Sequence, residues 1–231
     1  MIPLRDLNPT RRTAWMTALI VAGSAWVFFA VQPQSPEEGA RFLYAEATIP
    51  CEVVTAQPLS LDEIRTGTCE RSSGLPAFAT KSIALSLVAS IFFHGSIGHL
   101  VGNLWVLWIF GNNIEDSFGA FRYLLFYLGT GLVATAGHVF MNPTSTIPVV
   151  GASGAIAGVM GAYLVLHPQA RVRSIIPPLF FWPFDVPAVV FLLLWFAGQF
   201  ALAGAETNIA WEAHVAGFVA GALYGAIRRR R

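Results

Sequence analysis

A serine flanked by glycines, Ser153 in the stretch VVGASGAIAG, opens an apolar segment that is expected to be helical. Backbone amides in the first turn of a helix lack partners, and the helix dipole there favours negative charge. A nucleophilic serine at this place would have an oxyanion-binding group beside it. Gly151 and Gly154 would let a substrate backbone approach. The alternative is that these small residues only form a close helix-packing face, which is common in membranes.

A histidine in another apolar segment could activate this serine. His214, in AHVAGFVAG, lies about one turn from the predicted outer end of its helix, at the predicted depth of Ser153. A neutral imidazole beside a serine hydroxyl acts as a general base, and an ionisable residue inside a membrane segment is costly enough to suggest a function. The alternative is a hydrogen bond between helices. Gly217 and Gly221, four residues apart, would form a groove that brings the two helices together.

A third cluster of polar residues occurs in HGSIGHLVGN. His99 and Asn103 are four residues apart, so they share one face of a helix near its predicted outer end. Both can donate hydrogen bonds to charge that develops during acyl transfer, which predicts an oxyanion hole. Structural bonding between helices is the alternative for this pair, and it is the preferred interpretation of His94.

No carboxylate is placed to complete a catalytic triad. Glu212 is two residues from His214 and would point about 200° around the helix, and Asp185 is predicted on the inner side. We therefore predict a Ser-His dyad. No metal site is predicted, because the chain has no His-Glu-x-x-His pattern and His138 and His167 are not expected to converge with the other histidines.

The elements that must position these residues are membrane helices. Hydrophobic residues make up 55% of the 231 and charged residues 12%, which is half the usual globular share of about a quarter. The net charge of +1 suggests no nucleic-acid partner. Two apolar pieces, 83–93 and 174–184, are too short or too rich in proline to cross, so we expect them to be partly embedded. Six spans are predicted, near 13–31, 97–110, 121–141, 152–167, 187–204 and 210–227.

The distribution of basic residues orients these spans. With six spans and both termini cytoplasmic, ten Lys and Arg lie on the inner side and four on the outer side, in agreement with the positive-inside rule. The first span is expected to be retained, because it is too long for a signal peptide and no small-residue cleavage site ends it. Residues 32–82 then form an extracytoplasmic loop that holds Cys51 and Cys69. Whether these cysteines pair is left open.

The motifs together resemble those of the rhomboid intramembrane serine proteases. The likeness runs from about residue 90 to 227 and covers His99 and Asn103 in HLVGN, Ser153 in GASG and His214 in HVAGFVAG, in that order. The stretch GNNIEDSFG, 111–119, is similar to the family's Glu-x-x-x-Gly turn after the second span.

The resemblance implies a single all-α polytopic domain, a six-helix bundle with a water-filled cavity open to the outside. Ser153 would be the nucleophile, His214 the base and then the acid, and His99, Asn103 and the Ser153 amide the oxyanion-binding groups. Substrates would be single-span membrane proteins in the lipid bilayer, reaching the site past the fifth span, and no cofactor is expected. We place the protein in a membrane, and a prokaryotic cytoplasmic membrane is the expected compartment.

Two positions depart from the family pattern. No Trp occurs between Trp26 and Trp105, so the outer loop lacks the Trp-Arg pair of many members, and Ala157 stands where some members carry an aromatic residue stacked on the catalytic histidine. Two other functions are considered. One is a rhomboid-like protein that binds membrane helices without cleaving them. The other is a small transporter, which the absence of an internal repeat makes the weaker alternative.

Overall fold

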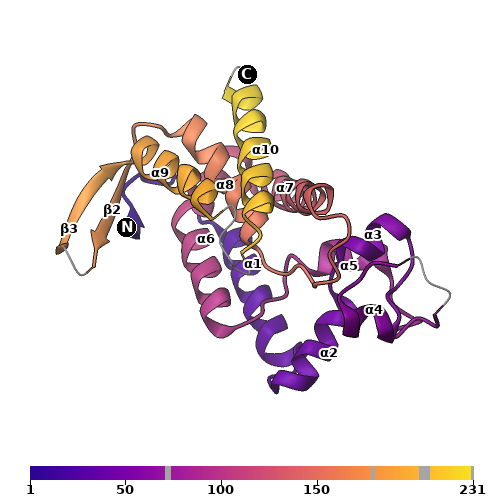
Figure 1. Cartoon of the computed structure of the whole chain (residues 1–231). Helices are drawn as coiled ribbons and strands as arrows, with labels where there is room; N and C mark the ends of the chain where they lie inside the picture. Colours follow the sequence, from indigo (N-terminus) through magenta and orange to yellow (C-terminus); the bar gives the residue numbers. More distant parts are fainter. Residues whose placement is uncertain (71–73, 178–179, 203–208, 230–231) are drawn as a thin grey trace.

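The computed structural model describes residues 1–70, 74–177, 180–202 and 209–229 of a mostly helical chain (Figure 1). A helix occupies the described part of each predicted span, and residues 203–204 of the predicted span 187–204 lie outside the described residues. Within the described residues, one helix, Ala120–Met141, is by itself both long and apolar enough to cross a membrane. The helices of the predicted spans are α1 (Trp15–Trp26), continued by the π-helix η1 (Val27–Val31), α6 (Ile97–Phe118), α7 (Ala120–Met141), α8 (Ser153–Leu166), α9 (Ala188–Ala201) and α10 (Trp211–Arg229).

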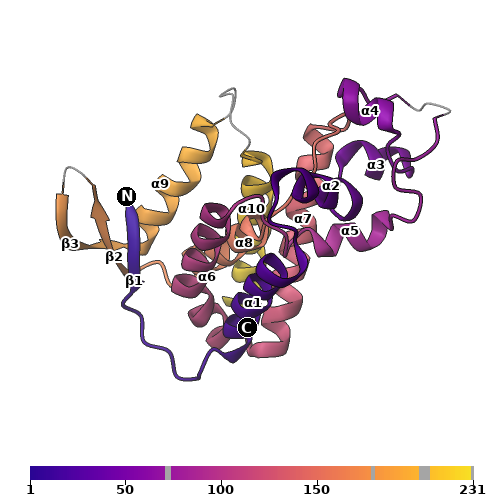
Figure 2. The same ribbon diagram turned by 90° about the horizontal axis from the view of Figure 1, so that it is seen from below.

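The central helix is α8, which lies between α6 and α10 in Figure 2. Every residue from 154 to 163 is buried. The small residues of this helix allow the close approach: a Cβ added at Gly158 would lie 2.5 Å from Thr130 Oγ1 on α7, and one added at Gly161 would collide with the Phe218 carbonyl oxygen on α10. The small residues of α8 therefore let the neighbouring helices pack closely around it.

The second span is longer than predicted. Helix α6 continues eight residues past the expected end at 110, because polar residues of its last two turns are buried and have partners. The Glu115 carboxylate accepts hydrogen bonds from the backbone amides of Met16 (3.0 Å) and Thr17 (2.7 Å), so it caps the first turn of α1. The Glu-x-x-x-Gly turn thus joins the second helix to the beginning of the first, and Gly119, at φ 78°, ends α6.

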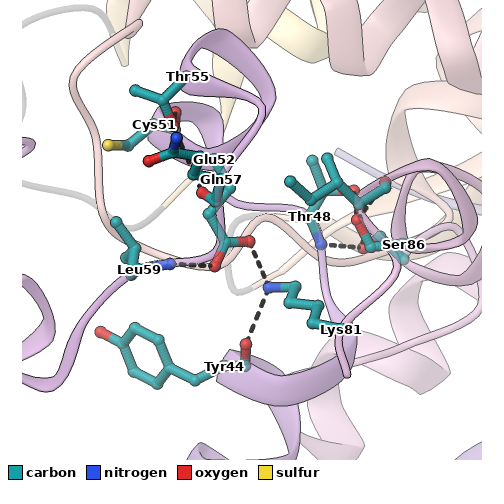
Figure 3. A network of polar contacts seen from close by, with 11 residues as sticks. Tyr44, Thr48, Cys51, Glu52, Thr55, Gln57, Leu59, Lys81 and Ser86 are labelled. Atoms are coloured by element: carbon teal, nitrogen blue, oxygen red, sulfur yellow. Dashed lines mark hydrogen bonds and ion pairs between the residues drawn. The ribbon is translucent and has the colours of Figure 1, made fainter. Parts of the chain in front are cut away.

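The predicted outer loop is folded. It contains α2 (Pro36–Glu46), α3 (Pro50–Thr55) and α4 (Leu61–Thr66), and the Cys51–Cys69 disulfide closes it. The Lys81 ammonium lies 2.5 Å from Glu52 Oε2 and donates to the Tyr44 carbonyl oxygen at 2.8 Å (Figure 3). Burial lowers the pKa of Lys81, and this carboxylate partner opposes the shift. The following segment, 83–93, forms only the short helix α5 (Ile83–Ala89).

The expectation of an all-α fold is wrong in one region. Strands β1 (Ile2–Asp6), β2 (Arg171–Ile176) and β3 (Phe180–Pro187) form an antiparallel sheet in the order β1-β2-β3. The prolines of 174–184 do exclude a helix, but its β-branched and aromatic residues favour extended strands. In β2, Val172 and Ser174 point inward and are fully buried. Figures 1 and 2 place this sheet and α9 on the opposite side of the bundle from α2–α5.

Candidate active site

Ser153 and His214 meet at the interface of α8 and α10. The serine is the first residue of α8, and its Oγ lies 2.8 Å from His214 Nε2. The helices can approach because glycines line both faces: a Cβ added at Gly217 would collide with the Gly154 carbonyl oxygen, and one added at Gly221 with that of Gly158. At this distance the imidazole can accept the hydroxyl proton, which is the first requirement for a nucleophilic serine.

His99 and Asn103 reach the same place from the first turns of α6. Gly151, two residues before the serine, has φ +123°, and a Cβ there would lie 2.7 Å from the His99 ring and 3.6 Å from Asn103 Nδ2. Asn103 is 8% exposed, and its Nδ2 has no hydrogen-bond partner among the described residues. The ring of His94 packs edge-on against His99 at 5.2 Å. The Asn103 amide therefore has a free donor beside Gly151, in the segment just before Ser153. From there it could donate a hydrogen bond to an oxyanion.

A small cavity of about 30 Å³ adjoins the serine. Its lining includes Ser90, Thr135, Gly151 and Ser153. Since one water requires about 10–15 Å³ of such space and two to four polar partners, the cavity has room for about two water molecules. Water can thus be held next to the serine inside a predominantly apolar bundle.

Two residues of α9 contact His214, and the sequence analysis identified neither. Gln199 Oε1 lies 2.7 Å from His214 Nδ1, on the side of the ring opposite Ser153. The Trp195 ring lies 5.9 Å from the imidazole, tilted by 38°. Ala157 is fully buried, and the aromatic ring beside His214 is that of Trp195 on α9. The available signal was a single amide in the apolar run FAGQFA, since lone polar residues inside membrane helices are costly.

The remaining polar residues lie apart from this cluster. As predicted, Glu212 turns away from His214, and it contacts His138 on α7 at 3.3 Å. His167 contacts Asn8 and Ser117 at the other end of the bundle. In the described parts of the chain, no three His, Cys, Asp or Glu side chains are grouped closely enough to hold a metal ion.

Comparisons with known proteins agree with the motifs. Residues 82–231 match the rhomboid domain family. The chain is 35% identical over 102 residues to "Presenilin-associated rhomboid-like protein A, mitochondrial" of Danio rerio, covering 43% of this chain and 27% of that protein. It is 30% identical over 150 residues to "Rhomboid protein 1, mitochondrial" of Saccharomyces cerevisiae, covering 61% and 41%. It is 30% identical over 135 residues to "Rhomboid protease GluP" of Bacillus subtilis, covering 58% and 24%.

These similarities span between about a quarter and two fifths of the length of the curated relatives. Two of these three relatives, and several other similar proteins, are named as mitochondrial, so the comparisons do not support the expected prokaryotic cytoplasmic membrane. They do agree that the protein is integral to a membrane.

Proposed function

Because the chain belongs to the rhomboid family, a family of helical membrane proteins that includes intramembrane serine proteases, we propose that it is a serine endopeptidase that cleaves membrane-embedded segments. The observation that carries the proposal is the 2.8 Å contact between Ser153 Oγ and His214 Nε2. A serine and a histidine rarely meet inside apolar helices without a chemical reason, because each polar group is costly there.

The reaction follows from the geometry. His214 Nε2 accepts the proton of Ser153 as Oγ attacks the scissile carbonyl carbon, and the resulting oxyanion accepts hydrogen bonds from His99, Asn103 Nδ2 and the Ser153 amide. The tetrahedral intermediate collapses to an acyl-enzyme while the imidazolium returns its proton to the leaving amine. Water from the adjoining cavity then attacks the ester, and His214 accepts a proton from that water. The protonated imidazole donates this proton to Ser153 Oγ as the carboxylic acid product departs.

The position of Ser153 suggests where substrates are cut. Helix α8 has 14 residues and spans about 21 Å at 1.5 Å per residue, less than a hydrocarbon core of about 30 Å. If the inner end of α8 lies at the cytoplasmic boundary, the serine lies below the outer boundary. We therefore propose cleavage of single-span membrane proteins near the outer face by a six-span protein with both termini cytoplasmic. A prokaryotic cytoplasmic membrane stays a prediction.

The test is covalent labelling by a fluorescent fluorophosphonate in detergent, which requires an activated serine and no known substrate. Wild-type protein should be labelled, and Ser153→Ala and His214→Ala should abolish labelling. Ser117→Ala is the matched control, because Ser117 Oγ also lies 3.2 Å from a histidine nitrogen, His167 Nε2, but far from the proposed oxyanion donors. Labelling of the control should be unchanged.

An unlabelled wild type, under conditions that label a related protease, would contradict the proposal. It would favour the alternative in which the protein binds membrane helices without cleaving them. Labelling that survives Ser153→Ala would assign the reactive serine to another position and would also contradict the proposed role of Ser153.

A further inference from the structure

The fifth predicted span contributes one polar side chain to the interior of the bundle. Gln199 is 6% exposed, whereas Leu193, Leu194 and Phe200 of the same helix are about half exposed on its outer face. Its amide contacts two groups: Oε1 lies 2.7 Å from His214 Nδ1, and Nε2 donates to the Trp195 carbonyl oxygen at 3.1 Å. The oxygen and the nitrogen of the Gln199 amide thus each have a partner within hydrogen-bond distance. The partner of the oxygen, His214, is the base of the proposed reaction.

The second contact fixes which way the amide points. A backbone carbonyl can only accept, so the nitrogen of Gln199 must face the Trp195 oxygen and the amide oxygen must face His214. A hydrogen bond to that oxygen requires a proton on Nδ1. In a neutral imidazole the other nitrogen, Nε2, then carries no proton, and it can accept the proton of Ser153 Oγ.

We propose that Gln199 is a positioning residue: it selects the Nδ1-protonated tautomer of His214 and holds the ring toward Ser153, in the place a carboxylate occupies in a Ser-His-Asp triad. This inference rests on the proposed function, because it concerns the same base. Trp195, one turn earlier on α9, adds a second constraint through its ring, 5.9 Å from the imidazole. The orientation of His214 therefore depends on α9 lying against α10.

Being neutral, Gln199 differs from a carboxylate in one respect. An amide dipole can orient the imidazole, but it stabilises the imidazolium that forms during attack less than a full negative charge would. A neutral partner also avoids the cost of burying a charge on a helix that faces lipid. The expected contribution is therefore smaller than that of a triad carboxylate and larger than that of a residue that only fills space.

Three variants separate positioning from packing. Gln199→Met keeps the length of the side chain and removes the strong acceptor, and it should slow fluorophosphonate labelling about 10- to 100-fold. Gln199→Glu keeps an acceptor for Nδ1–H and should recover labelling to within about tenfold of wild type. Its pH profile should shift, because a charged partner changes the proton affinity of the imidazole. Leu194→Met, on the exposed face, is the control and should label as wild type does.

A second readout does not depend on activity. In protein labelled with ¹⁵N-histidine, the His214 resonances, assigned by comparison with His214→Ala, should show one tautomer, protonated at Nδ1. Gln199→Met should show a mixture of both tautomers. An unlabelled wild type would refute the proposed function, whereas the tautomer would still test the role of Gln199. A Gln199→Met variant that labels at the wild-type rate across pH, or retains the single tautomer, would overturn the inference.

Discussion

Helices α8 and α9 both contact α10, but by different kinds of packing. Between α8 and α10 the backbones touch, since Cβ atoms added at Gly217 and Gly221 would collide with carbonyl oxygens of the opposite helix. Between α9 and α10, apart from the bond of Gln199 to His214, aromatic rings make the contacts: Phe196 stacks on Phe218 at 4.6 Å, and Phe200 lies 6.0 Å from Trp211. Backbone packing permits little sliding, whereas ring contacts can be broken and remade.

This difference separates two requirements of the proposed reaction. The close packing of α8 against α10 sets the distance between Ser153 and His214. Gln199 on α9 is proposed to set the tautomer of His214. A displacement of α9 would disturb the second requirement and leave the first intact.

The largest predicted effect concerns the proposed oxyanion hole, which α6 contributes beside the closely packed pair of helices. Asn103→Ala removes a donor from the proposed oxyanion hole and should slow fluorophosphonate labelling about 100- to 1,000-fold, because such donors act where charge develops. The ¹⁵N spectrum of His214 should not change, in contrast to the expectation for Gln199→Met. Asn112→Ala, nine residues further along α6, is the control. Labelling of Asn103→Ala at the wild-type rate would remove this residue from the mechanism.

The next effect is on stability. In Gly221→Ala the new methyl carbon would lie 1.8 Å from the Gly158 carbonyl oxygen, and no rotamer change can relieve a collision with the backbone. We expect a loss of about 3 kcal/mol or more in the free energy of unfolding, measured by unfolding in mixed detergent micelles and followed by circular dichroism. Wild-type stability in this variant would mean that α8 and α10 can move apart. The distinction between backbone packing at α8 and ring packing at α9 would then be wrong.

Gly198 on α9 has free space around it, unlike Gly221 on α10. Gly198 is exposed on a helix, and a Cβ there would meet nothing within 4 Å. Gly198→Ala should raise the free energy of unfolding by about 0.5–1 kcal/mol, because alanine loses less backbone entropy on forming a helix. The same unfolding measurement checks it, and labelling should stay at the wild-type rate. A destabilised Gly198→Ala would indicate that this face of α9 packs against protein.

Sequence reasoning reached the parts of the candidate site that depend on local order. Ser153 at the start of a helix, and His99 and Asn103 one turn apart, follow from spacing within a single element. The structure brings Ser153 against His214, and it brings His99 and Asn103 beside Gly151, two residues before the serine. Gln199 could not be assigned in this way, because its contact depends on how α9 is rotated against another helix. A lone amide has no spacing partner that would reveal this rotation.

The parts of the fold that were not predicted also depend on contacts between segments that are distant in the chain. The helices could be read from hydropathy, but the sheet pairs Ile2 with Ile175, and no local pattern reveals a strand partner so distant in the chain. The extra two turns of α6 were also missed, since buried Glu115 is stable in a helix only because the first turn of α1 supplies donors to it. Both errors concern polar or short segments whose partners lie elsewhere.

The smallest predicted effect tests whether the sheet holds the N-terminal end of α9, which begins directly after β3. Arg173 donates to both carboxylate oxygens of Asp185 at 2.8 and 3.1 Å, and these bonds lower the pKa of Asp185 below 3.8. The stabilising contribution is thus complete above pH 3.8 and is lost as the pH falls through the lowered pKa. Asp185→Asn should have a slightly lower melting temperature than wild type at neutral pH, and this difference should close on acidification.

The change in melting temperature should be small, because Arg173 and Asp185 are partly exposed and solvent screens surface ion pairs. Labelling at neutral pH should match that of wild type, because ring contacts along α9 still hold Gln199 against His214. If Asp185→Asn instead slows labelling as strongly as Gln199→Met, the sheet and not the aromatic contacts holds α9 in place. Helix α9 would then be anchored at its N-terminal end, and its freedom to move would be confined to its C-terminal end, which carries Gln199.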